Sequence, residues 1–94
     1  MADSVHAVYG KFEAIRAEKL AAGGSFNFTD FLHQVVKLGQ MAIDTSEERQ
    51  AISNAVMQFY DDYLGSHIPL NFRERTRSFV ADMVSQALLA AATL

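Results

Sequence analysis

Apolar residues recur every three or four positions through most of the chain, and this helical period restricts the fold more than any other feature. Turn-forming residues interrupt the period at two places, Gly23-Gly24-Ser25 and Gly65 to Pro69. The period-two alternation that a strand requires extends no further than Ser25 to Phe28. The sequence therefore predicts an all-α fold, a compact bundle of four amphipathic helices with short connections.

The four helices are expected at about residues 3–22, 28–43, 46–64 and 71–92, within a single domain that covers residues 1–94. Gly23 follows the first segment and suits the left-handed conformation that commonly ends a helix. Only a few residues join the second and third helices. Because short connections join neighbouring helices, we expect this pair to pack antiparallel.

Polar residues at the expected helix starts have the spacing of N-terminal caps. Asn27 with Asp30, and Thr45 with Glu48, each place a carboxylate three residues after a capping side chain, which is the pattern of a capping box. Asn71 is the expected cap of the last helix. These residues predict where three of the four helices begin.

Each helix carries an apolar stripe, and the four stripes together predict the core. Its members are Val5, Val8, Phe12, Ile15, Phe28, Phe31, Leu32, Val35, Val36, Ile43, Ile52, Ala55, Val56, Phe59, Tyr63, Phe72, Thr76, Phe79, Val80, Met83, Val84, Ala87, Leu88 and Ala91. Half of all residues are hydrophobic, which is more apolar surface than so small a core hides. We expect the excess to lie in a contact between subunits.

Composition excludes several classes of protein. The chain has 94 residues, no cysteine and a formal net charge of −3. Without cysteine there are no disulfides, thiolate metal sites or cysteine nucleophiles, and the lack of disulfides favours a cytoplasmic protein. No apolar stretch approaches the roughly 20 residues of a membrane span, so a soluble chain without a membrane partner is expected. The acidic balance argues against binding to nucleic acid.

The first helix has small residues where a solvated face would carry charges. Ala7, Gly10, Ala14, Ala17 and Ala21 follow one another at intervals of three and four, opposite the apolar stripe. Small side chains let two helix backbones approach closely, and a glycine inside a helix costs about 1 kcal/mol relative to alanine. A helix–helix contact is one interpretation of this face. High helix propensity of alanine is the other.

The end of the chain, Ala87 to Leu94, is apolar around the whole circumference of the helix. A helix that is apolar on all sides is expected to be buried. It either docks against the core of its own domain or lies in a homo-oligomer interface. On the second interpretation, Leu89 and Leu94 join the small-residue face as candidate interface residues.

Three arginines cluster at the start of the last helix. Arg73, Arg75 and Arg77 lie where the helix dipole disfavours cations, and Asp61 and Asp62 lie where it disfavours anions. The loop between the third and fourth helices brings the two groups together, which predicts ion pairs across it. The alternative is capture of an anion or an acidic partner by the three arginines.

Motifs for chemistry are weak. Asp30 and His33 have a spacing found in metal-binding bundles, and Asp61 or Asp62 with His67 offers a second set, but neither has enough ligands to define a site. No serine has the context of a nucleophile, and the tyrosines are expected to pack. We therefore predict no catalytic residue, no metal and no cofactor.

The favoured hypothesis is a non-enzymatic helical protein–protein interaction module, a homodimer that acts by binding another protein. The alternative is a small nucleic-acid-binding regulator that uses the arginine cluster. A helix-turn-helix would place Glu47 and Glu48 against the phosphates, which argues against that alternative.

Overall fold

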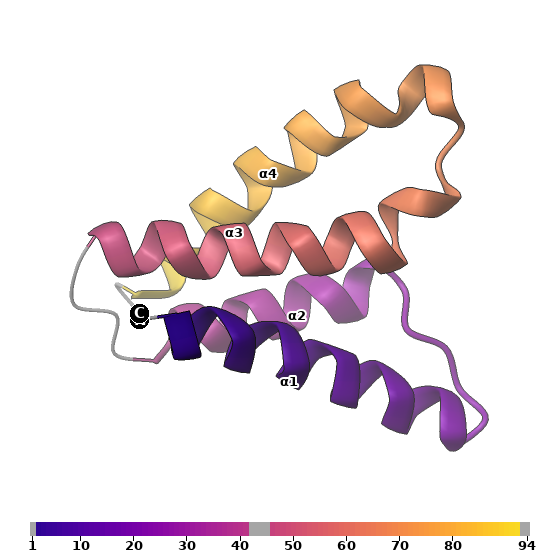
Figure 1. Cartoon of the computed structure of the whole chain (residues 1–94), viewed down its shortest axis with the longest axis horizontal. Helices are drawn as coiled ribbons and strands as arrows, with labels where there is room; N and C mark the ends of the chain where they lie inside the picture. The colour runs from indigo at the N-terminus through magenta and orange to yellow at the C-terminus, as the bar shows by residue number, and fades with distance from the viewer. Residues whose placement is uncertain (1, 42–45, 93–94) are drawn as a thin grey trace.

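The computed structural model describes residues 2–41 and 46–92, and confirms the all-α fold (Figure 1). Its elements are α1 (Ala2–Ala21), α2 (Phe28–Gly39), α3 (Ser46–Tyr63), a short 3₁₀ helix η1 (Gly65–His67), and α4 (Leu70–Ala92). The four α-helices match the predicted segments to within two residues, except at the end of α2 and around η1, which was not predicted.

The helices form two closely packed pairs, α1 with α3 and α2 with α4. In Figure 1, α1 and α3 run from left to right, whereas α2 and α4 run from right to left. The predicted antiparallel arrangement of α2 and α3 agrees with their directions, but these two helices meet through side chains and do not form one of the closely packed pairs. Aromatic rings hold these two apart: the ring centroids of Phe31 and Phe59 are 6.2 Å apart, and those of Phe31 and Tyr60 are 5.9 Å apart.

Two of the predicted helix ends have the expected bonds. Gly23 adopts a φ of 84°, and the N–H groups of Gly23 and Gly24 donate to the carbonyls of Leu20 and Lys19, which closes α1. At the start of α2, the side chains of Asn27 and Asp30 form the reciprocal bonds of a capping box. The predicted cap Thr45 lies outside the described residues.

Two boundaries differ from prediction. α2 ends at Gly39 and not near residue 43, because the N–H of Met41 bonds the carbonyl three residues back and tightens the last turn. Ile43 lies outside the described residues. α4 begins at Leu70, where the N–H of Phe72 bonds the carbonyl of Pro69, so Asn71 lies inside the first turn and not at the cap.

The core is centred on the fully buried ring of Phe59. Other rings surround it from α1, α2, α3 and the α1–α2 connection, with centroids 4.8–6.2 Å away: Tyr9, Phe12, Phe26, Phe31 and Tyr63. Edge-to-face geometry dominates these contacts, as expected for aromatic quadrupoles. The cluster joins the α1–α3 pair to α2.

Part of the predicted core of α4 is exposed. Val80, Val84, Leu88 and Ala91 are buried as expected, but Phe72 is 53% and Phe79 65% exposed. The prediction was wrong for these two because the first half of α4 diverges from α3, as Figure 1 shows, and leaves one side of the helix uncovered. Val5 has no described side chain.

Candidate interaction groove

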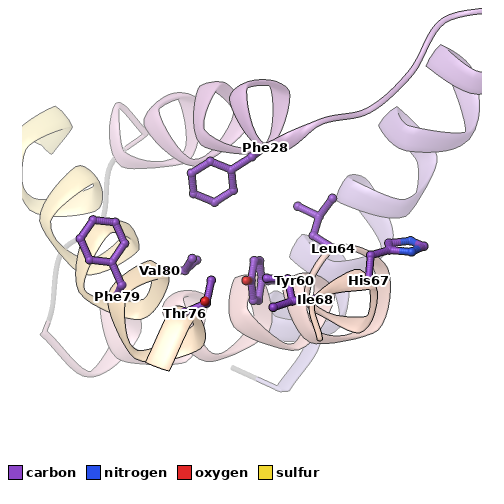
Figure 2. Close-up of a pocket in the computed structure, with 8 residues that line it drawn as sticks. All are labelled: Phe28, Tyr60, Leu64, His67, Ile68, Thr76, Phe79 and Val80. Atoms are coloured by element: carbon purple, nitrogen blue, oxygen red, sulfur yellow. The ribbon is translucent and has the colours of Figure 1, made fainter. Parts of the chain in front are cut away.

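An apolar pocket of about 490 Å³ opens between α4 and the rest of the bundle (Figure 2). It is lined by Phe28 of α2, Tyr60 and Leu64 at the end of α3, His67 and Ile68 at η1, and Thr76, Phe79 and Val80 of α4. Figure 2 shows the ring of Phe28 turned toward the opening and the imidazole of His67 turned away from it. The pocket thus offers hydrocarbon and aromatic surface.

A second pocket, of about 410 Å³, lies further along the same two helices. It is lined by Leu32, Val36, Phe79, Asp82, Met83, Gln86 and Ala87. Phe79 lines both pockets, so the two are neighbours along α4. We call the residues that line the two pockets the α2–α4 groove.

The groove exists because α2 and α4 touch at one end and separate at the other. Near the end of both helices, a methyl group added at Gly39 would lie 2.7 Å from the Cβ of Ala91, so the absence of a side chain permits the close approach. At the other end, the half-buried ring of Phe28 and the exposed ring of Phe79 both line the pocket. The widening leaves apolar side chains that neither helix covers.

The chemistry of the groove favours burial of apolar surface. Within it, the titratable side chains are Tyr60, His67 and Asp82. Burial raises the pKa of Tyr60, so its phenol stays neutral at physiological pH.

A polar network on the other side of the bundle joins α1 to α3. The hydroxyl of Tyr9 donates to Asp62 at 2.6 Å, and that of Tyr63 donates to Glu13. The guanidinium of Arg16 lies 4.6 Å from the ring centroid of Tyr63. The hydrogen bonds to carboxylates raise the pKa values of both tyrosines, which keeps each phenol a donor. Their role is to tie the helix pair together.

The small-residue face of α1 is exposed along its described length. Ala7, Gly10, Ala14, Ala17 and Ala21 are all solvent-accessible, and a methyl group added at Gly10 would meet no atom within 4 Å. This face therefore packs against no other helix of the described fold. Its use between subunits stays a prediction.

The apolar end of α4 is only partly covered. Leu88 and Ala91 are buried against the bundle, whereas Leu89 is 50% exposed. Docking against the domain's own core thus accounts for one side of the helix. Leu94 lies outside the described residues.

The arginine cluster is largely engaged within the fold. Arg77 pairs with Asp61 at 2.8 Å, as predicted, and this partner raises the pKa of the guanidinium. Arg73 instead donates to the carbonyls of Ile68 and Ser66 and braces the loop. Among the described residues, Arg75 is the one arginine of the three whose side chain has neither a hydrogen bond nor an ion pair.

The spacings considered for metal do not converge. The carboxylate of Asp30 accepts bonds from Lys19 at 2.9 Å and from the N–H of Asn27, and these lower its pKa. Asp61 and Asp62 bind Arg77 and Tyr9 respectively. In residues 2–41 and 46–92, no three His, Asp or Glu side chains gather as metal ligands.

The groove was missed from the sequence because its residues were assigned to the core. The signal lies in the width of the apolar face of α4, where Val80 and Val84 lie on one side and Phe79 and Met83 on the other. A face that wide exceeds what one neighbouring layer covers. Half of it is buried, and the other half lines the groove.

No protein-family model matches the chain, and searches of curated proteins and of solved structures find no significant similarity. Across the described ranges, no helix combines the length and the apolar character needed to cross a membrane. The fold and the groove therefore define the class: an all-α four-helix domain with an open apolar groove.

Proposed function

We propose that this chain is a non-enzymatic interaction module that holds an apolar helix of a protein partner in the α2–α4 groove. The observation that carries the proposal is Phe79, which is 65% exposed between two apolar pockets. Large exposed apolar patches on small domains mark interaction sites, because covering them removes apolar surface from water. A partner gains most by covering this ring and filling the space on both sides.

The exposed side of α4 has the spacing of a surface that receives another helix. Phe72, Thr76, Phe79, Met83 and Gln86 follow one another at intervals of four, three, four and three. The mean interval of 3.5 residues keeps such a row facing a second helix over several turns. We call these five residues the α4 seam.

A helix fits this surface better than a small molecule does. A small ligand would occupy one pocket, whereas the seam begins at Phe72, outside both pockets, and continues through the second one. Recognition of an amphipathic helix in a groove uses apolar anchors at this spacing. The length and the continuity of the seam therefore favour a helical partner.

The other predicted surfaces remain open hypotheses. The small-residue face of α1 has no pocket to receive an apolar anchor among the cavities described above. The nucleic-acid alternative is less favoured, because Arg73 already bonds the carbonyl of Ile68 and Arg77 already pairs with Asp61. The groove has both exposed apolar side chains and space beside them, which is why we favour it.

Photo-crosslinking in the protein's native cells tests the proposal directly. Phe79 is replaced by the photoreactive residue p-benzoyl-phenylalanine, and adducts are detected by mass. Gln58, exposed on α3, is the matched control site, and Ala17 tests the face of α1 in the same experiment. We expect a protein adduct from position 79 and none from position 58.

The outcomes separate the hypotheses. Absence of a protein adduct at position 79, in a variant that remains folded, would contradict groove binding. An adduct from position 17 alone would assign the interaction to α1. Circular dichroism confirms the fold of each variant before irradiation.

A further inference from the structure

Two opposite charges flank Phe79 on the same side of α4. Arg75 and Asp82 are seven residues apart, which places them on one face two turns from each other. Both are exposed, and in the part of the chain that the structure describes neither side chain has a bonded partner. They lie beside the α4 seam, at the flanking positions that select the partner in helix pairs.

We propose that the helix in the groove is α4 of a second copy of this chain, antiparallel to the first across a two-fold axis near Phe79. This inference rests on the proposed function. Under that symmetry Arg75 faces the partner subunit's Asp82, and Asp82 faces the partner subunit's Arg75. One pair of charges thus gives two intersubunit ion pairs.

The seam residues match in the same register. When Thr76 lies opposite Phe79 of the partner subunit, Phe72 lies opposite Met83 of the partner subunit. The two-fold axis generates each of these two contacts a second time. Each aromatic ring then meets a smaller or more flexible side chain, which allows the helices to approach closely. The charge pairs and the apolar layers therefore agree on one arrangement.

The charges favour an antiparallel over a parallel pair. In a parallel two-fold dimer, Arg75 would face Val80 of the partner subunit and Asp82 would face Ala87 of the partner subunit, so neither charge would gain a partner. A heterologous arrangement would leave one copy of the seam uncovered and continue into a chain of subunits. The closed antiparallel dimer covers both seams and pairs all four charges.

The chain also exposes more surface than a compact monomer of its mass. The accessible surface is 6076 Å² for this chain of 10.4 kDa. A compact monomer of that mass exposes about 5,400 Å². The excess is roughly 700 Å², and the uncovered side of α4 contributes to it through Phe72, Phe79 and Leu89.

Charge reversal, measured by sedimentation equilibrium, tests the inference. We compare the dissociation constant of the wild-type dimer with those of Arg75→Asp, Asp82→Arg and the double variant. Each single change replaces two attractive pairs by two repulsive ones, so we expect dissociation to become about tenfold easier at low salt. The double variant exchanges the charges and is expected to restore the wild-type value.

Matched controls separate pairing from net charge. Lys37→Asp and Glu47→Arg make the same changes in net charge at exposed positions of α2 and α3, outside both the α4 seam and the small-residue face of α1. If net charge alone governed association, Arg75→Asp and Asp82→Arg would shift it in opposite directions, as their controls do. If specific pairing between Arg75 and Asp82 governs association, both single reversals weaken it.

Three results would overturn the inference. They are a monomer at all concentrations, a dimer that neither reversal weakens, and a double variant without recovery. The crosslink at position 79 separates this failure from failure of the proposed function. An adduct with the mass of two chains supports the second copy. An adduct with another protein overturns self-association and retains groove binding, and no adduct overturns both.

Discussion

Glycine substitutions at two helix positions have opposite expected effects. At Gly39, a new Cβ would lie 2.7 Å from the Cβ of Ala91 and 3.0 Å from the carbonyl oxygen of Leu88. Ordinary carbon contacts are about 3.5–4.0 Å, so Gly39→Ala forces α2 and α4 apart by roughly 1 Å. At Gly10, the same methyl group would meet no atom within 4 Å.

The free energies follow from two opposing effects. Overpacking of this kind costs about 1–3 kcal/mol at Gly39, and because Gly39 is the last residue of α2, alanine recovers there only part of the about 1 kcal/mol of helix propensity that it gains inside a helix. We therefore expect Gly39→Ala to lower the free energy of unfolding by about 1 kcal/mol, and Gly10→Ala to raise it by about 1 kcal/mol. For a domain of this size, each change shifts the melting temperature by about 4–8 °C.

Thermal and urea unfolding followed by circular dichroism measures both variants under the same conditions. Gly10→Ala reports the gain in helix propensity without a steric clash, so a loss of stability in Gly39→Ala reports the clash at the crossing of α2 and α4. If Gly39→Ala were as stabilising as Gly10→Ala, the close approach of these helices would be refuted. The account of how the groove opens would then fail with it.

Further predictions concern the core, the ion pairs and the groove. Phe59→Ala removes a fully buried ring, so we expect a loss of about 3–5 kcal/mol in urea unfolding. The folded state lowers the pKa of Asp30, so this carboxylate stabilises the fold at neutral pH and loses that effect as pH falls below its ordinary value of 3.8. The difference in melting temperature between Asp30→Asn and wild type should therefore shrink in acid. A double-mutant cycle on Arg77 and Asp61 should give less than about 1 kcal/mol, because both side chains are solvent-exposed. Phe79→Ser should change monomer stability by less than about 0.5 kcal/mol but abolish self-association in sedimentation equilibrium, and a stability loss above about 2 kcal/mol would contradict this.

Sequence alone predicts those parts of the fold that depend on local interactions. The capping box of Asn27 and Asp30 and the left-handed Gly23 each involve residues within one or two turns, so their chemistry is visible in the sequence. The pairing of α2 with α4 depends on residues far apart, such as Gly39 and Ala91. No local sequence pattern indicates which other helix will pack against Gly39.

The polar network shows the same limit. The tyrosines of α1 and α3 were expected to pack, and they do, but their hydroxyls also bind carboxylates of the opposite helix. The partners Tyr9 and Asp62 are separated by 53 positions in the chain. Amino-acid type indicates that such a phenol needs an acceptor, whereas only the packing of the helices supplies its identity.

The groove depends on a distinction between neighbouring residues. Phe79 and Val80 are adjacent and both apolar, yet Val80 is 3% exposed and Phe79 is 65% exposed. Successive positions on a helix differ by about 100°, so one residue faces the core while the next faces away from it. The fold uses the half of the apolar face that contains Val80. The remaining half, which contains Phe79, is largely uncovered in the monomer, and in our proposal it is the surface that a partner helix covers.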